Sequence, residues 1–106
     1  MVDLVEVVVT AAAPLQGPAP SLRGVGGSGV LAHVVPAMRA VYRWDGAVHD
    51  DPQARVGLHT RAALVPAIVE RARIEHPDEV PCVIALPLTG GHPDYLAWVV
   101  AETREP

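Results

Sequence analysis

The amino-acid sequence predicts an α+β fold of the ferredoxin-like type, in which β-α-β-β-α-β elements form an antiparallel sheet with helices on one face. Three observations predict it. Apolar, strand-like segments occur at 2–10, 30–44, 53–59 and 80–86. A helical spacing of apolar residues separates the last two of these segments. Neither an internal repeat nor a break in composition divides the 106 residues, so we expect one domain over 1–106.

The first expected strand, 2–10, ends in a run of valines and is typical of a strand buried on both faces. The segment 11–29 that follows contains three prolines and five glycines. Because both residue types oppose a regular helix, we expect the first helix of the fold to be weak or irregular.

A β-hairpin is predicted next. The strand 30–44 is interrupted by Pro36, where a bulge is expected, and Asp45-Gly46 is a strong turn signal. The partner strand is predicted at 53–59. The residues 50–52 (DDP) favour a bulged or longer loop arm over a clean two-residue turn.

The second helix is predicted to start near Leu64, with Thr60 as its N-cap, and to end at His76-Pro77. Its apolar stripe comprises Leu64, Val65, Ile68, Val69 and Ala72. The strand 80–86 should be buried. A short C-terminal helix follows, which Asp94 is placed to cap and which Tyr95 and Trp98 should pack onto the sheet.

Composition excludes several classes of function. The net charge is −4, with eight arginines, no lysine and no basic stripe, which disfavours nucleic acid as a partner. No apolar stretch is long enough to cross a membrane as a helix. Cys82 is the only cysteine, so neither an internal disulfide nor a cysteine-based zinc site is expected. Asp3 and Glu6 stand where a signal peptide would be positively charged, and we expect a cytoplasmic protein.

The apolar residues are mostly small. Alanine and valine make up 34 of the 53, and there is no phenylalanine. Helices on one face of the predicted sheet would leave its valine-rich strands uncovered on the other. The composition therefore favours burial between subunits as well as within one.

Two histidines are the strongest candidates for chemistry. With the turn near Asp45-Gly46, pairs whose numbers sum to about 91 or 92 should face each other across the hairpin, which makes His33 and His59 approximate neighbours. They could share a metal ion, act as a general acid and base, or be exposed polar residues at a strand end. A bulge in the arm could place them on opposite faces of the sheet.

Four other residues are candidates for a ligand cleft or an interface between subunits. Tyr42 and Trp44 share one face of the hairpin, with Arg43 on the other. Cys82 should lie near Thr10, at the sheet end opposite His33 and His59, and is expected to be buried and inert unless a neighbouring subunit brings a group to it.

From residue 33 onward the sequence resembles the CutA family of divalent-cation-tolerance proteins, which are related in fold to PII-type signalling trimers. The motifs that carry the resemblance are VP at 35–36, VYRWDG at 41–46, HPDEVP at 76–81, IALP at 84–87 and PDYLAW at 93–98. The resemblance implies a ferredoxin-like subunit, an extended hairpin arm packed between the subunits of a homotrimer, and binding of a divalent metal such as copper. Tyr95, in the last of these motifs, is a further candidate for a ligand cleft or an interface between subunits.

The chain departs from the family pattern at several positions. Leu31 and His33 stand where the family commonly has a cysteine and, two places later, a polar residue. His59 stands where the family has a lysine before a threonine, and Cys82 stands where it commonly has a glutamate at the start of the last strand. The family's thiol ligand is therefore absent.

Three hypotheses follow. The first is a CutA-like homotrimer that binds copper, zinc or a small ligand, with His33 and His59 as metal ligands and no organic cofactor. The second is a CutA-derived small-molecule enzyme with these histidines as proton-transfer groups and Arg43 holding an anion. The third is a PII-like regulatory protein.

Overall fold

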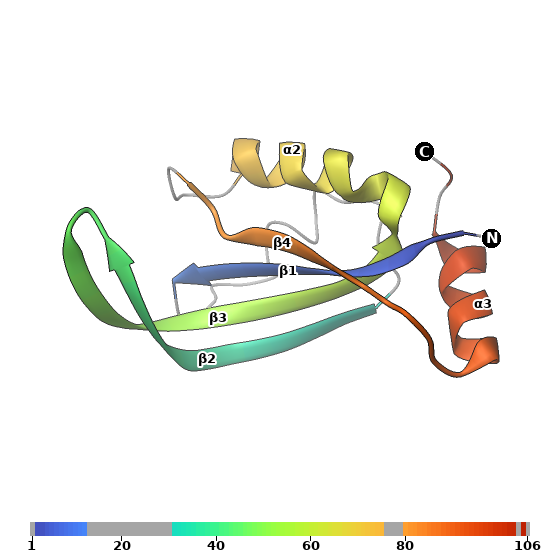
Figure 1. Cartoon of the computed structure of the whole chain (residues 1–106), viewed down its shortest axis with the longest axis horizontal. Helices are drawn as coiled ribbons and strands as arrows, with labels where there is room; N and C mark the ends of the chain where they lie inside the picture. Colours follow the sequence, from blue (N-terminus) through green and yellow to red (C-terminus); the bar gives the residue numbers. More distant parts are fainter. Residues whose placement is uncertain (1, 13–30, 76–79, 104, 106) are drawn as a thin grey trace.

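The computed structural model of the chain describes residues 2–12, 31–75, 80–103 and 105. Four strands form one antiparallel sheet in the order β2-β3-β1-β4 (Figure 1). The strands are β1 (Leu4–Ala12), β2 (Leu31–Trp44), β3 (Ala47–Arg61) and β4 (Val83–Pro87), and the helices are α2 (Val65–Glu75) and α3 (Pro93–Glu102). The predicted ferredoxin-like α+β class is confirmed. The irregular first helix is predicted for 11–29. β1 continues to Ala12, and the remainder of that segment lies outside the described residues.

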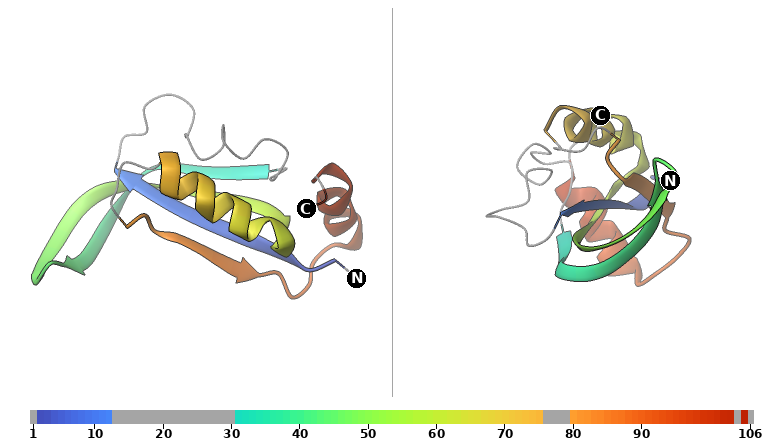
Figure 2. Two further views of the ribbon diagram at one scale, coloured as in Figure 1. Left: turned by 90° about the horizontal axis from the view of Figure 1, so that it is seen from above. Right: turned by 90° about the vertical axis from the view of Figure 1, so that its left-hand side faces the viewer.

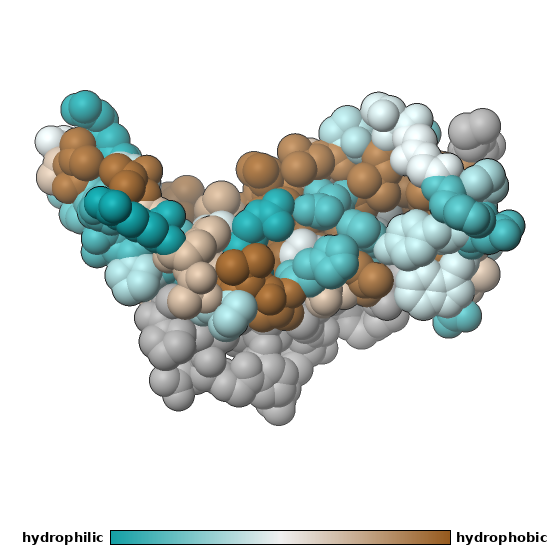
Figure 3. All heavy atoms as spheres, turned by 90° about the horizontal axis from the view of Figure 1, so that it is seen from below, coloured by the Kyte–Doolittle hydropathy of each residue, from teal (hydrophilic) through white to brown (hydrophobic). Residues whose placement is uncertain are grey.

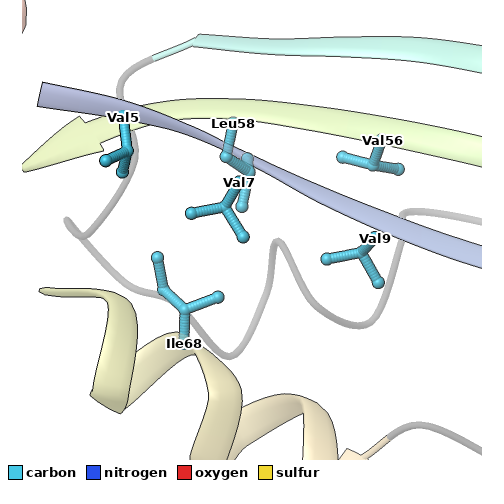
Figure 4. Packing of buried hydrophobic residues seen from close by; sticks show 6 residues of the cluster. All are labelled: Val5, Val7, Val9, Val56, Leu58 and Ile68. Carbon is cyan, nitrogen blue, oxygen red and sulfur yellow. The ribbon is translucent and has the colours of Figure 1, made fainter. Parts of the chain in front are cut away.

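The core lies between the sheet and α2. Side chains alternate along β1, so Val5, Val7 and Val9 point toward α2 and pack with Val56, Leu58 and Ile68 (Figure 4). All six are buried. The even-numbered residues of β1 therefore point to the other face of the sheet, which α2 does not cover (Figures 1 and 2).

The hairpin of β2 and β3 projects beyond the rest of the sheet as an arm (Figure 1). Asp45 and Gly46 have φ values of 50° and 75°, as a two-residue hairpin turn requires, which confirms the turn prediction. The expected loop at 50–52 is wrong, because β3 runs unbroken from Ala47 and Pro52 pairs with Arg39. β3 pairs with β1 only from Gln53 to Arg61, so Pro52 lies in a part of β3 that has β2 alone as a neighbour, where a proline is tolerated. The irregularity lies in β2, between Val35 and Met38, as Pro36 predicted.

The connection from β3 to α2 differs from the expected one. Thr60 is a buried residue of β3, and a 3-10 turn (Ala62–Leu64) with Arg61 at its N-cap position leads into α2. The strand extends past Thr60 because it pairs with β1 up to Arg61. The expected start of the helix near Leu64 is correct to one residue.

Three expectations about the C-terminal part are wrong. β4 is an edge strand, mostly exposed, and Cys82 before it is exposed as well, because only β1 flanks it. The cap of α3 is His92, whose side chain accepts a hydrogen bond from the backbone N–H of Asp94. None of the helices in the described part of the chain is long and apolar enough to cross a membrane.

Candidate functional site

Three potential metal ligands meet on the sheet face that α2 leaves open. Glu6 lies on β1, His59 on β3 and His33 on β2, so the group spans three adjacent strands. One ligand atom from each lies within 4.8 Å of the others, and this is the one such group of three within the described ranges. Figure 3 shows hydrophilic side chains between hydrophobic ones on this face.

The pairing of the strands explains why these side chains meet. Glu6 is directly opposite His59, while His33 is opposite Gly57, two residues before His59. All four positions therefore share one face. The rings of His33 and His59 lie edge to face with centroids 5.6 Å apart.

The predicted proximity of His33 and His59 is correct, although the register is not the expected one. In the arm, the residue numbers of paired positions on β2 and β3 sum to 91, as for Tyr42 and His49. At the base of the arm they sum to 90, as for His33 and Gly57. The irregularity after Val35 makes this shift. With a sum of 91 throughout, His33 would pair with Leu58 and point to the opposite face from His59. With the shift, His33 and His59 are diagonal neighbours on one face.

Gly57 leaves room for the carboxylate of Glu6. A Cβ at position 57 would lie 3.1 Å from Oε1 of Glu6 and 3.3 Å from its Cδ. These distances are shorter than ordinary van der Waals contact. A side chain at this position would therefore require the carboxylate to shift by a few tenths of an ångström.

Hydrogen bonds fix the orientation of His59, whose side chain is only 12% exposed. Its Nε2 donates to Oε2 of Glu6 at 3.0 Å, and its Nδ1 is hydrogen-bonded to the hydroxyl of Tyr95, on α3. Arg55 donates to Oε1 of Glu6 at 3.2 Å. The imidazole is therefore held at both nitrogens, and both carboxylate oxygens are engaged.

These contacts shift two pKa values. The hydrogen bond from His59, with a smaller contribution from Arg55, lowers the pKa of the Glu6 carboxyl despite the opposing effect of burial. Burial first, and then the charge of Glu6, raises the pKa of the Tyr95 hydroxyl. At neutral pH the site therefore offers an ionised carboxylate beside a neutral phenol.

The chemistry of the group fits a divalent transition metal. Imidazole nitrogens suit zinc and copper, and a carboxylate is a common third ligand. Donor atoms around a tetrahedral zinc lie about 3.3 Å apart, given bonds of about 2.0–2.1 Å. The present group must close to reach that spacing, and His33, whose side chain is exposed, has room to rotate.

The other predicted site residues lie elsewhere, except Tyr95. Tyr42 and Trp44 share one side of the arm and are partly exposed, and the strand alternation places Arg43 on the other side. Cys82 lies beside Thr10, whose N–H donates to its carbonyl oxygen at 3.2 Å, at the opposite end of β1 from Glu6. The structure thus separates Cys82 and the arm from the histidine pair within one subunit.

Sequence reasoning missed Glu6, Arg55 and Gly57. The sequence gives a sign of Glu6, since it interrupts the valine-rich strand and is the one charged residue of β1. A carboxylate inside an apolar strand needs a partner, and pairing β1 with β3 would have pointed to His59. Gly57 within a strand is likewise a sign of close approach by another group.

The position of Tyr95 depends on how α3 is held against the sheet. Arg61, at the end of β3, donates from Nε to the hydroxyl of Thr103 at 2.9 Å and from Nη2 to the carbonyl oxygen of Val100 at 2.7 Å. These bonds join the C-terminal end of α3 to β3. The first turn of α3 then carries Tyr95 to His59.

Comparison with known proteins identifies relatives by sequence. Protein CutA 1, chloroplastic, of Oryza sativa subsp. japonica is 40% identical over 73 residues, which are 69% of this chain and 41% of that protein. Protein CutA of Mus musculus is 40% identical over 67 residues, 63% of this chain and 38% of that protein. The divalent-cation tolerance protein CutA of Thermus thermophilus is 34% identical over 71 residues, 67% of this chain and 69% of that protein. The chain thus spans about two fifths of the length of the plant and mouse relatives.

Solved structures of the same kind share the fold over nearly the whole chain. Solved structures of CutA1 from Oryza sativa and from Thermus thermophilus match with TM-scores of 0.82 and 0.80, at 32% and 26% identity. The match to the rice structure covers 99% of this chain and 97% of the rice chain. The match to the Thermus thermophilus structure covers 95% of this chain and 99% of the bacterial chain. A family model described as CutA1 divalent ion tolerance protein matches residues 29–102. The resemblance noted in the sequence is confirmed, and the chain belongs to the CutA1 divalent ion tolerance family.

Proposed function

We propose that this protein binds a divalent transition-metal ion, zinc or copper, through Glu6, His33 and His59. The observation that carries the proposal is the convergence of these three side chains from three strands, with donor atoms within 4.8 Å of one another. Two imidazoles and one carboxylate favour zinc or copper over magnesium or calcium, which prefer oxygen ligands. Membership of a divalent ion tolerance family agrees with such a role.

The remaining contacts of the site are compatible with metal binding. The hydrogen bonds to Glu6 keep its carboxylate ionised, as a ligand must be. Without metal, the Glu6 carboxylate accepts hydrogen bonds from Nε2 of His59 and from Arg55. A bound cation therefore has to displace the Nε2 proton of His59 and weaken the hydrogen bond from Arg55. We therefore propose a reversible site of moderate affinity and no organic cofactor.

Titration calorimetry of the metal-free protein with Zn²⁺ and Cu²⁺ tests the proposal. We expect one ion per chain in the wild type and loss of binding in His33→Ala and His59→Ala. His49→Ala is the matched control, because His49 stacks on Tyr42 in the arm, away from the site. Absence of binding up to millimolar metal, or equal binding by all three variants, would refute the assignment.

We further propose that the functional unit is a homotrimer and that the arm lies between its subunits. Both sides of the arm carry exposed apolar side chains, with Trp44 51% exposed on one side and Val48 65% exposed on the other. On β4, Ile84 and Leu86 are also exposed, on the face that carries the metal-ligand group. A stable monomer in analytical ultracentrifugation would refute this part.

The cytoplasmic location of the protein remains a prediction, and cell fractionation tests it.

A second candidate function is acid–base chemistry on a small molecule. One observation favours it: Glu6, His59 and Tyr95 form a continuous hydrogen-bonded chain, in which a carboxylate orients an imidazole that contacts a hydroxyl. Saturation-transfer NMR tests this candidate. Binding of an organic ligand that needs His59 but no metal would favour it over the first.

A further inference from the structure

We propose that Tyr95 is a positioning residue for the metal site, whose hydroxyl reverses its hydrogen bond to His59 when a cation binds. In the metal-free protein the hydroxyl donates a hydrogen bond to Nδ1, and in the metal-bound protein its oxygen accepts a hydrogen bond from the Nδ1–H group. This inference rests on the cation-binding function proposed above and assigns a role to a residue that is not itself a ligand.

The starting state follows from the partners of His59. An ionised carboxylate can only accept hydrogen bonds, so Nε2, which lies 3.0 Å from Oε2 of Glu6, carries a proton. A neutral imidazole then has its lone pair on Nδ1, where the partner is the hydroxyl of Tyr95. The phenol therefore donates in the metal-free state.

Metal binding requires the opposite tautomer. Nε2 is the nitrogen beside Glu6, so it is the atom that can share a cation with this carboxylate. When Nε2 gives its lone pair to the metal, its proton leaves to solvent and Nδ1 takes up another, so the imidazole stays neutral. The Nδ1–H then needs an acceptor.

Tyr95 is suited to both states because a hydroxyl is a donor and an acceptor. Burial and the charge of Glu6 raise the pKa of this phenol, which keeps its proton in place. With His59 only 12% exposed, little water is available to replace the phenol as a partner. Loss of the hydroxyl would therefore leave the Nδ1–H unsatisfied in the metal-bound protein.

The position of Tyr95 is fixed by surroundings that do not use its hydroxyl. Its ring lies edge to face against His59, with centroids 5.8 Å apart at 83°, and 5.8 Å from the ring of Trp98. Removal of the hydroxyl alone, in Tyr95→Phe, should keep this packing. The variant thus separates the hydrogen bond from the ring.

The test measures zinc affinity and the His59 tautomer in the same samples. Zn²⁺ is the probe because it is diamagnetic and leaves the histidine NMR signals visible. We expect Tyr95→Phe to weaken zinc binding about 10–100-fold, the usual effect of removing a group that orients a metal-bound histidine. Tyr42→Phe, which loses a hydroxyl that donates to Asp51 in the arm, is the matched control and should bind like the wild type.

Long-range ¹H–¹⁵N spectra at pH 8 should show His59 protonated on Nε2 without metal and on Nδ1 with zinc. The Nδ1 proton should exchange faster with water in Tyr95→Phe than in the wild type. Zinc affinity of Tyr95→Phe within twofold of the wild type, or a proton on Nδ1 before metal is added, would overturn the inference while leaving the metal site intact. Absence of zinc binding by the wild type would instead refute the proposed function, and this inference with it.

Discussion

Replacement of Gly57 by alanine tests whether the missing side chain at this position makes the metal site. The added Cβ would lie 3.1 Å from Oε1 of Glu6, so the carboxylate must move by a few tenths of an ångström. This oxygen accepts from Arg55, and its partner oxygen accepts from His59. Hydrogen bonds to charged groups contribute about 1.5–3 kcal/mol, and a small displacement forfeits part of that.

The effect on folding should be smaller than the effect on metal binding. The backbone at Gly57 is extended strand and lacks the positive φ that only glycine adopts easily. Alanine also restricts the unfolded chain, which stabilises the native state by about 0.4–1 kcal/mol where the backbone is compatible. We therefore expect the free energy of unfolding to change by no more than about 1 kcal/mol.

Metal affinity depends on the placement of the ligand itself. We expect the dissociation constant for zinc to rise at least tenfold in Gly57→Ala, in the range seen when groups that orient ligands are removed. Calorimetry with Zn²⁺ and urea unfolding of the metal-free protein give the two quantities. Gly90→Ala is the matched control, since nothing lies within 4 Å of its Cβ position. Zinc affinity within twofold of the wild type would show that Gly57 does not shape the site.

Two further predictions concern stability. Ile68→Ala should lower the free energy of unfolding by about 2–4 kcal/mol, because this side chain is buried in the core. Val69 is exposed, so Val69→Ala should lower the free energy of unfolding by much less. Because the pKa of Glu6 is lowered in the folded protein, its contribution to stability is present above the unfolded-state value and is lost as pH falls through the folded-state value. Glu6→Gln should therefore reduce the loss of stability in acid, measured by urea unfolding between pH 6 and 3. Part of the loss should persist, since the pKa values of Asp50 and Glu70 are lowered too.

Much of the fold follows from local sequence signals. The Asp45-Gly46 turn and the alternation along the hairpin place the histidines near each other without any tertiary information. The capping predictions fail where tertiary structure competes with local preference. Thr60 has the side chain of an N-cap, yet its pairing with Val5 keeps it in the strand. His92 caps α3 although Asp94 is the stronger sequence signal, because His92 directly precedes the first helical residue, Pro93.

The site was only half predictable for a different reason. His33 and His59 lie on one hairpin, so their distance depends on a turn and a register that the sequence indicates. Glu6 reaches His59 through the pairing of β1 with β3, a contact between segments 53 residues apart. Strand order is a property of the whole fold, and local patterns do not specify which strands become neighbours.

The two faces of the sheet divide the roles of the molecule. On the α2 side, Val5, Val7 and Val9 form a small-residue core that any similar apolar set could fill. On the open side, the same strand carries Glu6 into a position that is useful only with His59 opposite it and Gly57 beside it. A carboxylate in this strand gains nothing from the core and loses hydration. Its presence is best explained by the partners across the sheet, so the side of β1 that does not build the core is the side where function should be sought.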